Sequence, residues 1–194
     1  MGIAPSAWAW LTMHPDGHPL PGRVRMDLDE ARQLLVESTA FAGSGARLHL
    51  WERLMSYLAE FVALELEYDE RLVEFIWLGG SFVSAEPDPR NVDVTVGINV
   101  EAEARIKTQA RGTWLAKAFS RRKMLPEFGV SPIRLPYKPA ASTFKNHEAG
   151  VQEQAYFRER GAWDDWWQRC RTEASPAPSL ETAVAVRGYL EVVL

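Results

Sequence analysis

The sequence lacks several features that would assign the protein to an oxidising compartment or to a membrane. Cys170 is its one cysteine, so no internal disulfide can form, which fits a reducing compartment. No apolar run reaches the roughly 18 residues that a membrane-spanning helix needs. The N-terminus also lacks the basic start and apolar segment of a secretory signal. We therefore expect a cytoplasmic protein without a membrane segment.

An excess of positive charge is also absent. The chain has 22 Lys and Arg against 26 Asp and Glu, which gives a net charge of −4 and an isoelectric point near 5.6. Non-specific duplex binding needs a broad basic surface, because neutralised phosphates supply most of its affinity. The charge balance therefore gives no support to a nucleic-acid partner.

What is present indicates one folded domain. With 194 residues and 46% hydrophobic content, residues 1–194 can bury a single core. Residues 1–25 are rich in Pro, Gly and His, and we expect them to be irregular. His14 and His18 lie four apart, but the prolines around them exclude the helix that would bring both onto one metal ion.

The helical segments follow from capping residues and apolar spacing. Asp27 with Glu30 three residues later predicts a capped helix that ends near residue 38. Residues 47–66 carry apolar side chains at amphipathic spacing. A second long helix is expected over residues 101–119, and two helical pieces over 150–158 and 163–171. Their aromatic stripe, Tyr156, Phe157, Trp163, Trp166 and Trp167, is typical of packing rather than of base stacking.

The strands complete an α/β (α+β) prediction. Residues 72–78, 92–98 and 130–135 have β-branched, aromatic or alternating apolar patterns, and the chain becomes β-prone again from residue 182 to its end. We expect a small, twisted, mixed sheet with helices mainly on one face and a closing C-terminal strand.

One motif carries chemistry as well as structure. Gly79, Gly80 and Ser81 follow the first of these strands, and Asp93 lies on the next. Glycine allows positive φ and close approach of the backbone to a ligand, and the serine adds a hydroxyl, so the turn suits a phosphate. The plain alternative is a turn with no ligand and an acid on a solvated strand face.

This arrangement resembles the nucleotidyltransferase superfamily of DNA polymerase beta. The segments 18–22, 80–94 and 187–192 extend the likeness over most of the chain, to a family of small bacterial nucleotidyltransferase-like proteins. The resemblance implies that Gly79, Gly80 and Ser81 hold the phosphates of a nucleoside triphosphate. It also implies that Asp93 binds Mg²⁺ or Mn²⁺ in catalysis.

The sequence departs from that family's metal-binding pattern. Asn91 stands where the first of two paired acids is expected, so it would be a weak, neutral co-ligand beside Asp93. The third acid is expected near Ser131, yet the nearest one is Glu127, which we place in a loop. A site of three carboxylates is thus reduced to Asp93.

Basic residues offer further partners for phosphate. The resemblance makes Lys117, Arg121, Arg122 and Lys123 candidates, although cations at the end of a helix are equally expected from its dipole. Arg134 interrupts an apolar strand near the position of the third acid. It would either replace the metal with a fixed positive charge that binds phosphate, or lie on the solvated side of the strand.

Two functions follow. The first is a nucleotidyltransferase-fold protein with weak or no catalytic activity that binds a nucleotide or a protein partner, for example in a toxin–antitoxin or defence pair, or as a homo-oligomer. The alternative is an active metal-dependent enzyme that transfers NMP from an NTP to a hydroxyl of RNA, protein or a small molecule. The carboxylate count favours the first.

Overall fold

A computed structural model describes residues 17–141, 144, 149–170 and 177–194. His14 and most of the expected irregular N-terminal segment lie outside these residues. A single five-stranded sheet organises the described chain, with strand order β1-β5-β2-β3-β4. The strands are β1 (Gly22–Met26), β2 (Val73–Gly79), β3 (Val92–Asn99), β4 (Val130–Tyr137) and β5 (Gly188–Val192).

The sheet is mixed, as the sequence predicts. Strands β1 and β5 are parallel, as are β3 and β4, whereas β2 is antiparallel to both of its neighbours, β5 and β3. The C-terminal strand β5 therefore lies inside the sheet, between β1 and β2, and so joins the N-terminal part of the described chain to its centre.

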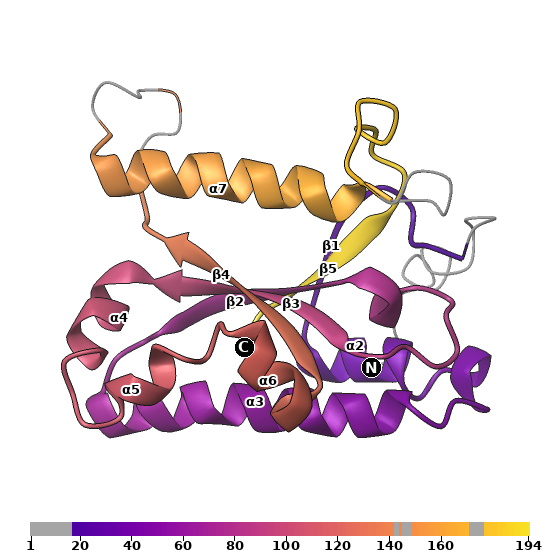
Figure 1. Cartoon of the computed structure of the whole chain (residues 1–194), viewed down its shortest axis with the longest axis horizontal. Helices are drawn as coiled ribbons and strands as arrows, with labels where there is room; N and C mark the ends of the chain where they lie inside the picture. The colour runs from indigo at the N-terminus through magenta and orange to yellow at the C-terminus, as the bar shows by residue number, and fades with distance from the viewer. Residues whose placement is uncertain (1–16, 142–143, 145–148, 171–176) are drawn as a thin grey trace.

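Helices cover the two faces of the sheet unequally (Figure 1). Below it lie α2 (Leu28–Leu35), the long α3 (Arg47–Tyr68), α5 (Gly112–Leu115) and α6 (Arg121–Phe128), with α4 (Val100–Ile106) at one end. Above it, α7 (Val151–Gln168) crosses the strands. Helices mainly on one face are thus confirmed. No helix in the described ranges is long and apolar enough to cross a membrane.

Strand alternation divides the buried side chains between the two faces. On β3, the even-numbered residues Val94 and Val96 pack into the main core with α3 residues such as Leu54. The opposite face of the sheet forms a second, smaller cluster in which Trp77 meets Trp167 of α7. Odd-numbered residues of β3, including Asp93, consequently lie on the α7 face.

The N-terminal boundary of the fold differs from expectation. Residues 22–25, expected to be irregular, belong to β1, which pairs with β5 over its whole length. Only Val24 and Met26 of this strand pack against the core. A short strand with so few inward apolar residues is specified by its partner at the other end of the chain rather than by local pattern.

Two helix predictions were wrong. The chain from 101 to 119 forms the short helices α4 and α5 because it turns sharply between them. The amide of Gly112 bonds Gln109 O at 3.0 Å, and a Cβ on Gly112 would lie 2.6 Å from the carbonyl carbon of Lys107. Conversely, the two pieces expected over 150–171 are one helix, α7, which continues through Gly161.

The long helix α3 begins with a buried arginine. Arg47 is 1% exposed, and its guanidinium donates four hydrogen bonds of 2.5 to 3.0 Å to backbone carbonyls, those of Leu35, Phe82, Ser84 and Glu86. It also lies 3.5 Å from the ring centroid of Phe41. Burial lowers the pKa of Arg47 to about 10, although the charges of Glu86 and Asp88 oppose the shift. Arg47 therefore fixes the loop that leads from β2 to β3.

Replacing this arginine should destabilise the fold. Arg47→Met keeps much of the side-chain volume but leaves buried carbonyls without a donor, so the free energy of unfolding should fall by about 3 kcal/mol in urea denaturation. Arg71→Met, at an exposed arginine paired with Glu74, is the control and should change it by less than about 0.5 kcal/mol. Equal effects of the two variants would show that Arg47 does not hold the loop.

A second substitution tests the continuity of α7. Gly161 lies inside the helix, and a Cβ there would meet no atom within 4 Å. Gly161→Ala should therefore raise the free energy of unfolding by about 0.5–1 kcal/mol, whereas the reverse change at the next position, Ala162→Gly, should lower it by a similar amount. Thermal unfolding measures both changes. If Gly161 lay in a joint between two separate helices, Gly161→Ala would not stabilise the protein.

Candidate functional site

An open cavity of about 580 Å³ lies on the α7 face of the sheet. It forms where β2 ends and where the parallel strands β3 and β4 begin, beneath the C-terminal half of α7. The residues that line it are Gly80, Ser81, Asn91, Asp93, Arg121, Ser131, Ile133, Trp163, Trp166, Trp167 and Arg187. Its volume is within the range of ordinary small-molecule sites.

The glycine turn forms one wall of the cavity. After β2 the chain enters a short 3₁₀ turn (Gly80–Val83) rather than an open loop. Gly80 has φ +69°, and a Cβ on it would overlap the carboxylate of Asp93. A Cβ on Gly79 would lie 2.9 Å from Cδ2 of Trp167, and closer to two other ring atoms. Both glycines are thus required by close approach, and Gly80 by its φ as well.

Asp93 lies at the centre of this wall. In the sheet it pairs with Gly79 on one side and Ser131 on the other. The side-chain amide of Asn91 donates to Asp93 Oδ1 at 3.1 Å. Burial raises the pKa of the Asp93 carboxyl, whereas hydrogen bonds with Ser131 and Asn91 and the charges of Arg121 and Arg187 act to lower it. The carboxylate is therefore partly desolvated, but its hydrogen bonds and the two arginines stabilise its charge.

Arginines approach the cavity from two different elements. Arg121, the first residue of α6, donates from Nε to Ser131 Oγ at 3.2 Å. Arg187 immediately precedes β5, and its Nε donates to the carbonyl oxygen of Trp167 at 3.1 Å. Two guanidiniums and one carboxylate thus line the cavity.

Tryptophans of α7 form the opposite wall. Trp167 is buried, and its Nε1 donates to Thr95 Oγ1 at 2.8 Å, which ties α7 to β3. Trp163 and Trp166 are half-buried, and their rings meet edge to face at 6.4 Å. The aromatic stripe therefore does pack, as expected, but two of its members also line the cavity.

These donors do not fit the divalent metal that the resemblance implies. A pair of Mg²⁺ or Mn²⁺ ions requires several oxygen anions, yet Asp93 is the only carboxylate among the lining residues. In the described part of the chain, no group of three or more His, Cys, Asp or Glu could hold a metal ion. The amide of Asn91 is already engaged as a donor to Asp93. The cavity suits an anion better than a cation.

The structure gathers most of the residues expected from the sequence. Gly80, Ser81, Asn91 and Asp93 all line the cavity, and Gly79 lies directly behind it against Trp167. The other two predicted phosphate-binding residues, Arg134 and Lys117, are not among the residues that line the cavity.

Arg134 and Lys117 are not brought to the cavity. Arg134 is on the opposite face of β4 from Ser131, and its Nε donates to Glu103 of α4 at 2.8 Å. Lys107 also pairs with Glu103, at 2.8 Å. Lys117 is exposed in the turn after α5, among residues that do not line the cavity.

Sequence reasoning did not single out four of the residues that line the cavity, namely Arg121, Arg187, Trp163 and Trp166. It considered Arg121 only within a basic cluster, and it gave Arg187 no role. It treated Trp163 and Trp166 as packing residues. Arg121 could have been singled out because it begins the helix that leads into β4, the parallel neighbour of the strand that carries Asp93. Nothing in the local sequence marks Arg187.

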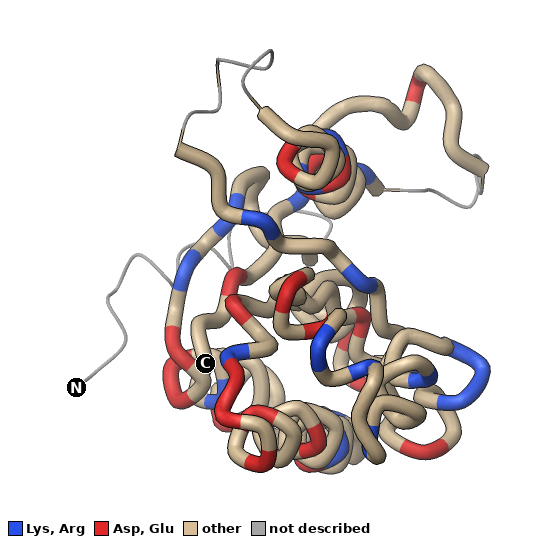
Figure 2. Tube along the Cα trace, turned by 90° about the vertical axis from the view of Figure 1, so that its left-hand side faces the viewer, with Lys and Arg blue, Asp and Glu red and all other residues tan. Residues whose placement is uncertain are grey.

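Both signs of charge occur together over the rest of the described surface. Helices α3 and α7 each contain more acidic than basic residues, and red and blue segments are interspersed along the described trace (Figure 2). Neither helix therefore forms a basic face. The concentration of arginine near the cavity is a local feature.

Comparison with known proteins gives a family. No curated protein and no solved structure matches the chain. A sequence model of one family matches residues 11–192, which is most of the chain. The chain belongs to that family, which is described as "Family of unknown function (DUF6932)".

Proposed function

We propose that the protein is a nucleotide-binding member of the nucleotidyltransferase type, with weak or no catalytic activity. One observation carries the proposal: a glycine turn, a single carboxylate and two arginines face the same cavity. This combination can hold a phosphate without a divalent metal. The resemblance to nucleotidyltransferases adds the expectation that the phosphate belongs to a nucleotide.

The phosphate-binding part consists of the Gly80–Ser81 turn and the two arginines. Arginine pairs with phosphate through charge-assisted and often bidentate hydrogen bonds, and it keeps its charge at all ordinary pH values. Because Arg121 and Arg187 come from α6 and from the segment before β5, they can contact an anion from two directions. Ser81 adds a hydroxyl on the side of the turn.

The base-binding part is the tryptophan wall. Trp163 and Trp166 present partly exposed indole rings to the cavity. Stacking of a base on an aromatic ring contributes roughly 1–3 kcal/mol and tolerates any base. This wall therefore supports binding of nucleotides as a class, without a preference among ATP, CTP, GTP and UTP.

A metal-dependent transferase is the alternative, and one observation favours it. The carboxylate of Asp93 lies directly against Gly80, so a metal on that carboxylate would be close to a phosphate in the turn. Against it, the remaining oxygen anions that such a metal requires are not among the lining residues. The two functions make opposite predictions for Asp93.

The first prediction concerns the charge of Asp93. Asp93→Asn keeps the shape of the side chain but removes a negative charge beside the phosphate, so nucleotide should bind roughly three- to tenfold more tightly. Calorimetric titration with each NTP in the presence of EDTA measures this. Glu127→Gln should leave the affinity unchanged, because it makes the same charge change at an exposed residue that lies on α6 and not in the loop expected from the sequence.

The contrary result is equally specific. If nucleotide binds only with Mg²⁺ or Mn²⁺, and Asp93→Asn abolishes that binding, the protein is a metal-dependent enzyme and the metal-free proposal fails. A search for acceptor hydroxyls would then be justified. Absence of binding by any NTP, with or without metal, would refute both functions.

The second prediction separates the cavity arginine from its neighbour. Arg121→Ala should weaken NTP binding about tenfold or more, because it removes a charge-assisted contact to phosphate. Arg122→Ala is the matched control, since Arg122 is exposed in the same turn of α6 but does not line the cavity. Equal losses in the two variants at physiological salt would indicate diffuse electrostatic attraction instead of a defined site.

A further inference from the structure

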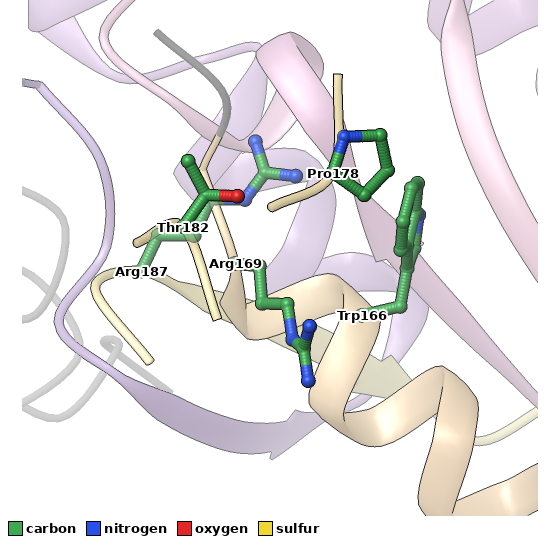
Figure 3. Close-up of a pocket in the computed structure, with 5 residues that line it drawn as sticks. All are labelled: Trp166, Arg169, Pro178, Thr182 and Arg187. Carbon is green, nitrogen blue, oxygen red and sulfur yellow. The ribbon is translucent and has the colours of Figure 1, made fainter. Parts of the chain in front are cut away.

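A second, smaller pocket adjoins the cavity and shares two residues with it. Trp166, Arg169, Pro178, Thr182 and Arg187 line it (Figure 3). Of these, Trp166 and Arg187 also line the cavity that contains Asp93. Trp166 and Arg187 are therefore common to both spaces.

The small pocket adds a third arginine to the region. Arg169 follows the last residue of α7 and is one of the residues that line the pocket (Figure 3). Its Nε is buried and has no hydrogen-bond partner. Its Nη2 pairs with the carboxylate of Asp165, whose side chain is 55% exposed. A buried donor of a charged group without an acceptor is costly, and an anion in the pocket would supply one.

The size of the pocket limits what it can take. Its volume is about 30 Å³. That space suits one compact group and is too small for a base or a sugar. Two guanidiniums, from Arg169 and Arg187, make an anion the matching compact group.

We propose that this pocket is a second phosphate subsite, and that the ligand of the protein is a nucleotide carrying two separate phosphate groups. This inference rests on the proposed nucleotide-binding function of the cavity. One phosphate lies at the Gly80–Ser81 turn, and the second lies between Arg169 and Arg187. The nucleoside between them packs on Trp166, the residue that both spaces share.

The charge pattern distinguishes this ligand from an ordinary NTP. In an NTP all phosphates belong to one chain and can be held together beside the turn and Arg121. A subsite in a separate pocket that shares Trp166 with the cavity suits a phosphate that leaves the nucleoside from a different position. Nucleoside 3′,5′-bisphosphates and the 5′-phosphorylated ends of single strands both have this chemistry.

Calorimetric titration of the full chain with four probes tests the inference. The probes are AMP, ATP, adenosine 3′,5′-bisphosphate and the dinucleotide pApA, at one ionic strength and in EDTA. The bisphosphate should bind roughly tenfold or more tightly than AMP, because the second phosphate gains charge-assisted contacts. A similar gain for pApA would identify the end of a strand as a source of the ligand, whereas a gain for the bisphosphate alone would identify the small molecule.

Substitutions at the small pocket should act on the second phosphate alone. Arg169→Ala should abolish the advantage of the bisphosphate while leaving the affinities for AMP and ATP unchanged. Asp165→Asn removes the carboxylate that competes for Arg169, so it should increase the advantage several-fold. Arg158→Ala, at an exposed arginine on the same helix, is the control and should change none of the affinities.

The outcomes separate failure of this inference from failure of the proposed function. If AMP and ATP bind but the bisphosphate and pApA bind no more tightly than AMP, the second subsite is refuted and the nucleotide site stands. If Arg169→Ala weakens binding of all four probes equally, Arg169 contributes only general charge, and the subsite is likewise refuted. If none of the four probes binds, both proposals fall.

Discussion

The buried guanidinium of Arg47 is the interaction on which the candidate site depends. It joins the end of α2, the start of α3 and the loop after the glycine turn through four hydrogen bonds to backbone carbonyls. Asp88, later in the same loop, accepts from the amides of Gly45 and Ala46 just before α3 at 2.9 and 3.2 Å. The loop between β2 and β3 is therefore held at both ends against one helix. That restraint places Gly80 where only a residue without a Cβ fits beside Asp93.

The alternation of the sheet then decides which residues can act together. A period of two puts Asp93, Thr95 and Ser131 on the α7 face, and it sends Arg134 to the other face, where Glu103 neutralises it. Because α7 is bonded to β3 through Trp167 and to the segment before β5 through Arg187, the helix is fixed over the sheet. The cavity is consequently lined by four separate parts of the chain, within residues 80–93, 121–133 and 163–167 and at Arg187.

The same dependence explains what the sequence could and could not predict. Strong local signals were sufficient for the capping box at Asp27, for α3, for the strands that flank the glycine turn, and for the placement of Asp93 near that turn. The strand Gly22–Met26 and the break before Gly112 depend on partners or packing outside their own segments. The continuity of α7 was missed because a glycine inside a helical pattern lowers local propensity without preventing the helix. Arg187 carries no local mark of function, since its role arises only when β5 inserts beside β2.

The balance of charge in the cavity links binding to the expected loss of catalysis. A site with several carboxylates repels a phosphate unless divalent ions intervene, and the same ions then stabilise the charge that develops during transfer. Under the proposed function, a cavity with one carboxylate and two arginines would neutralise the phosphate directly, so that the ground state is bound without a metal. The arginines are held by hydrogen bonds to Ser131 and to the backbone of Trp167, and this fixes them relative to the turn. In the proposed function, such an arrangement supplies the phosphate-binding half of nucleotidyltransferase chemistry, whereas the metal-binding half, which would position the attacking hydroxyl and the leaving group, has one carboxylate, Asp93, among the residues that line the cavity.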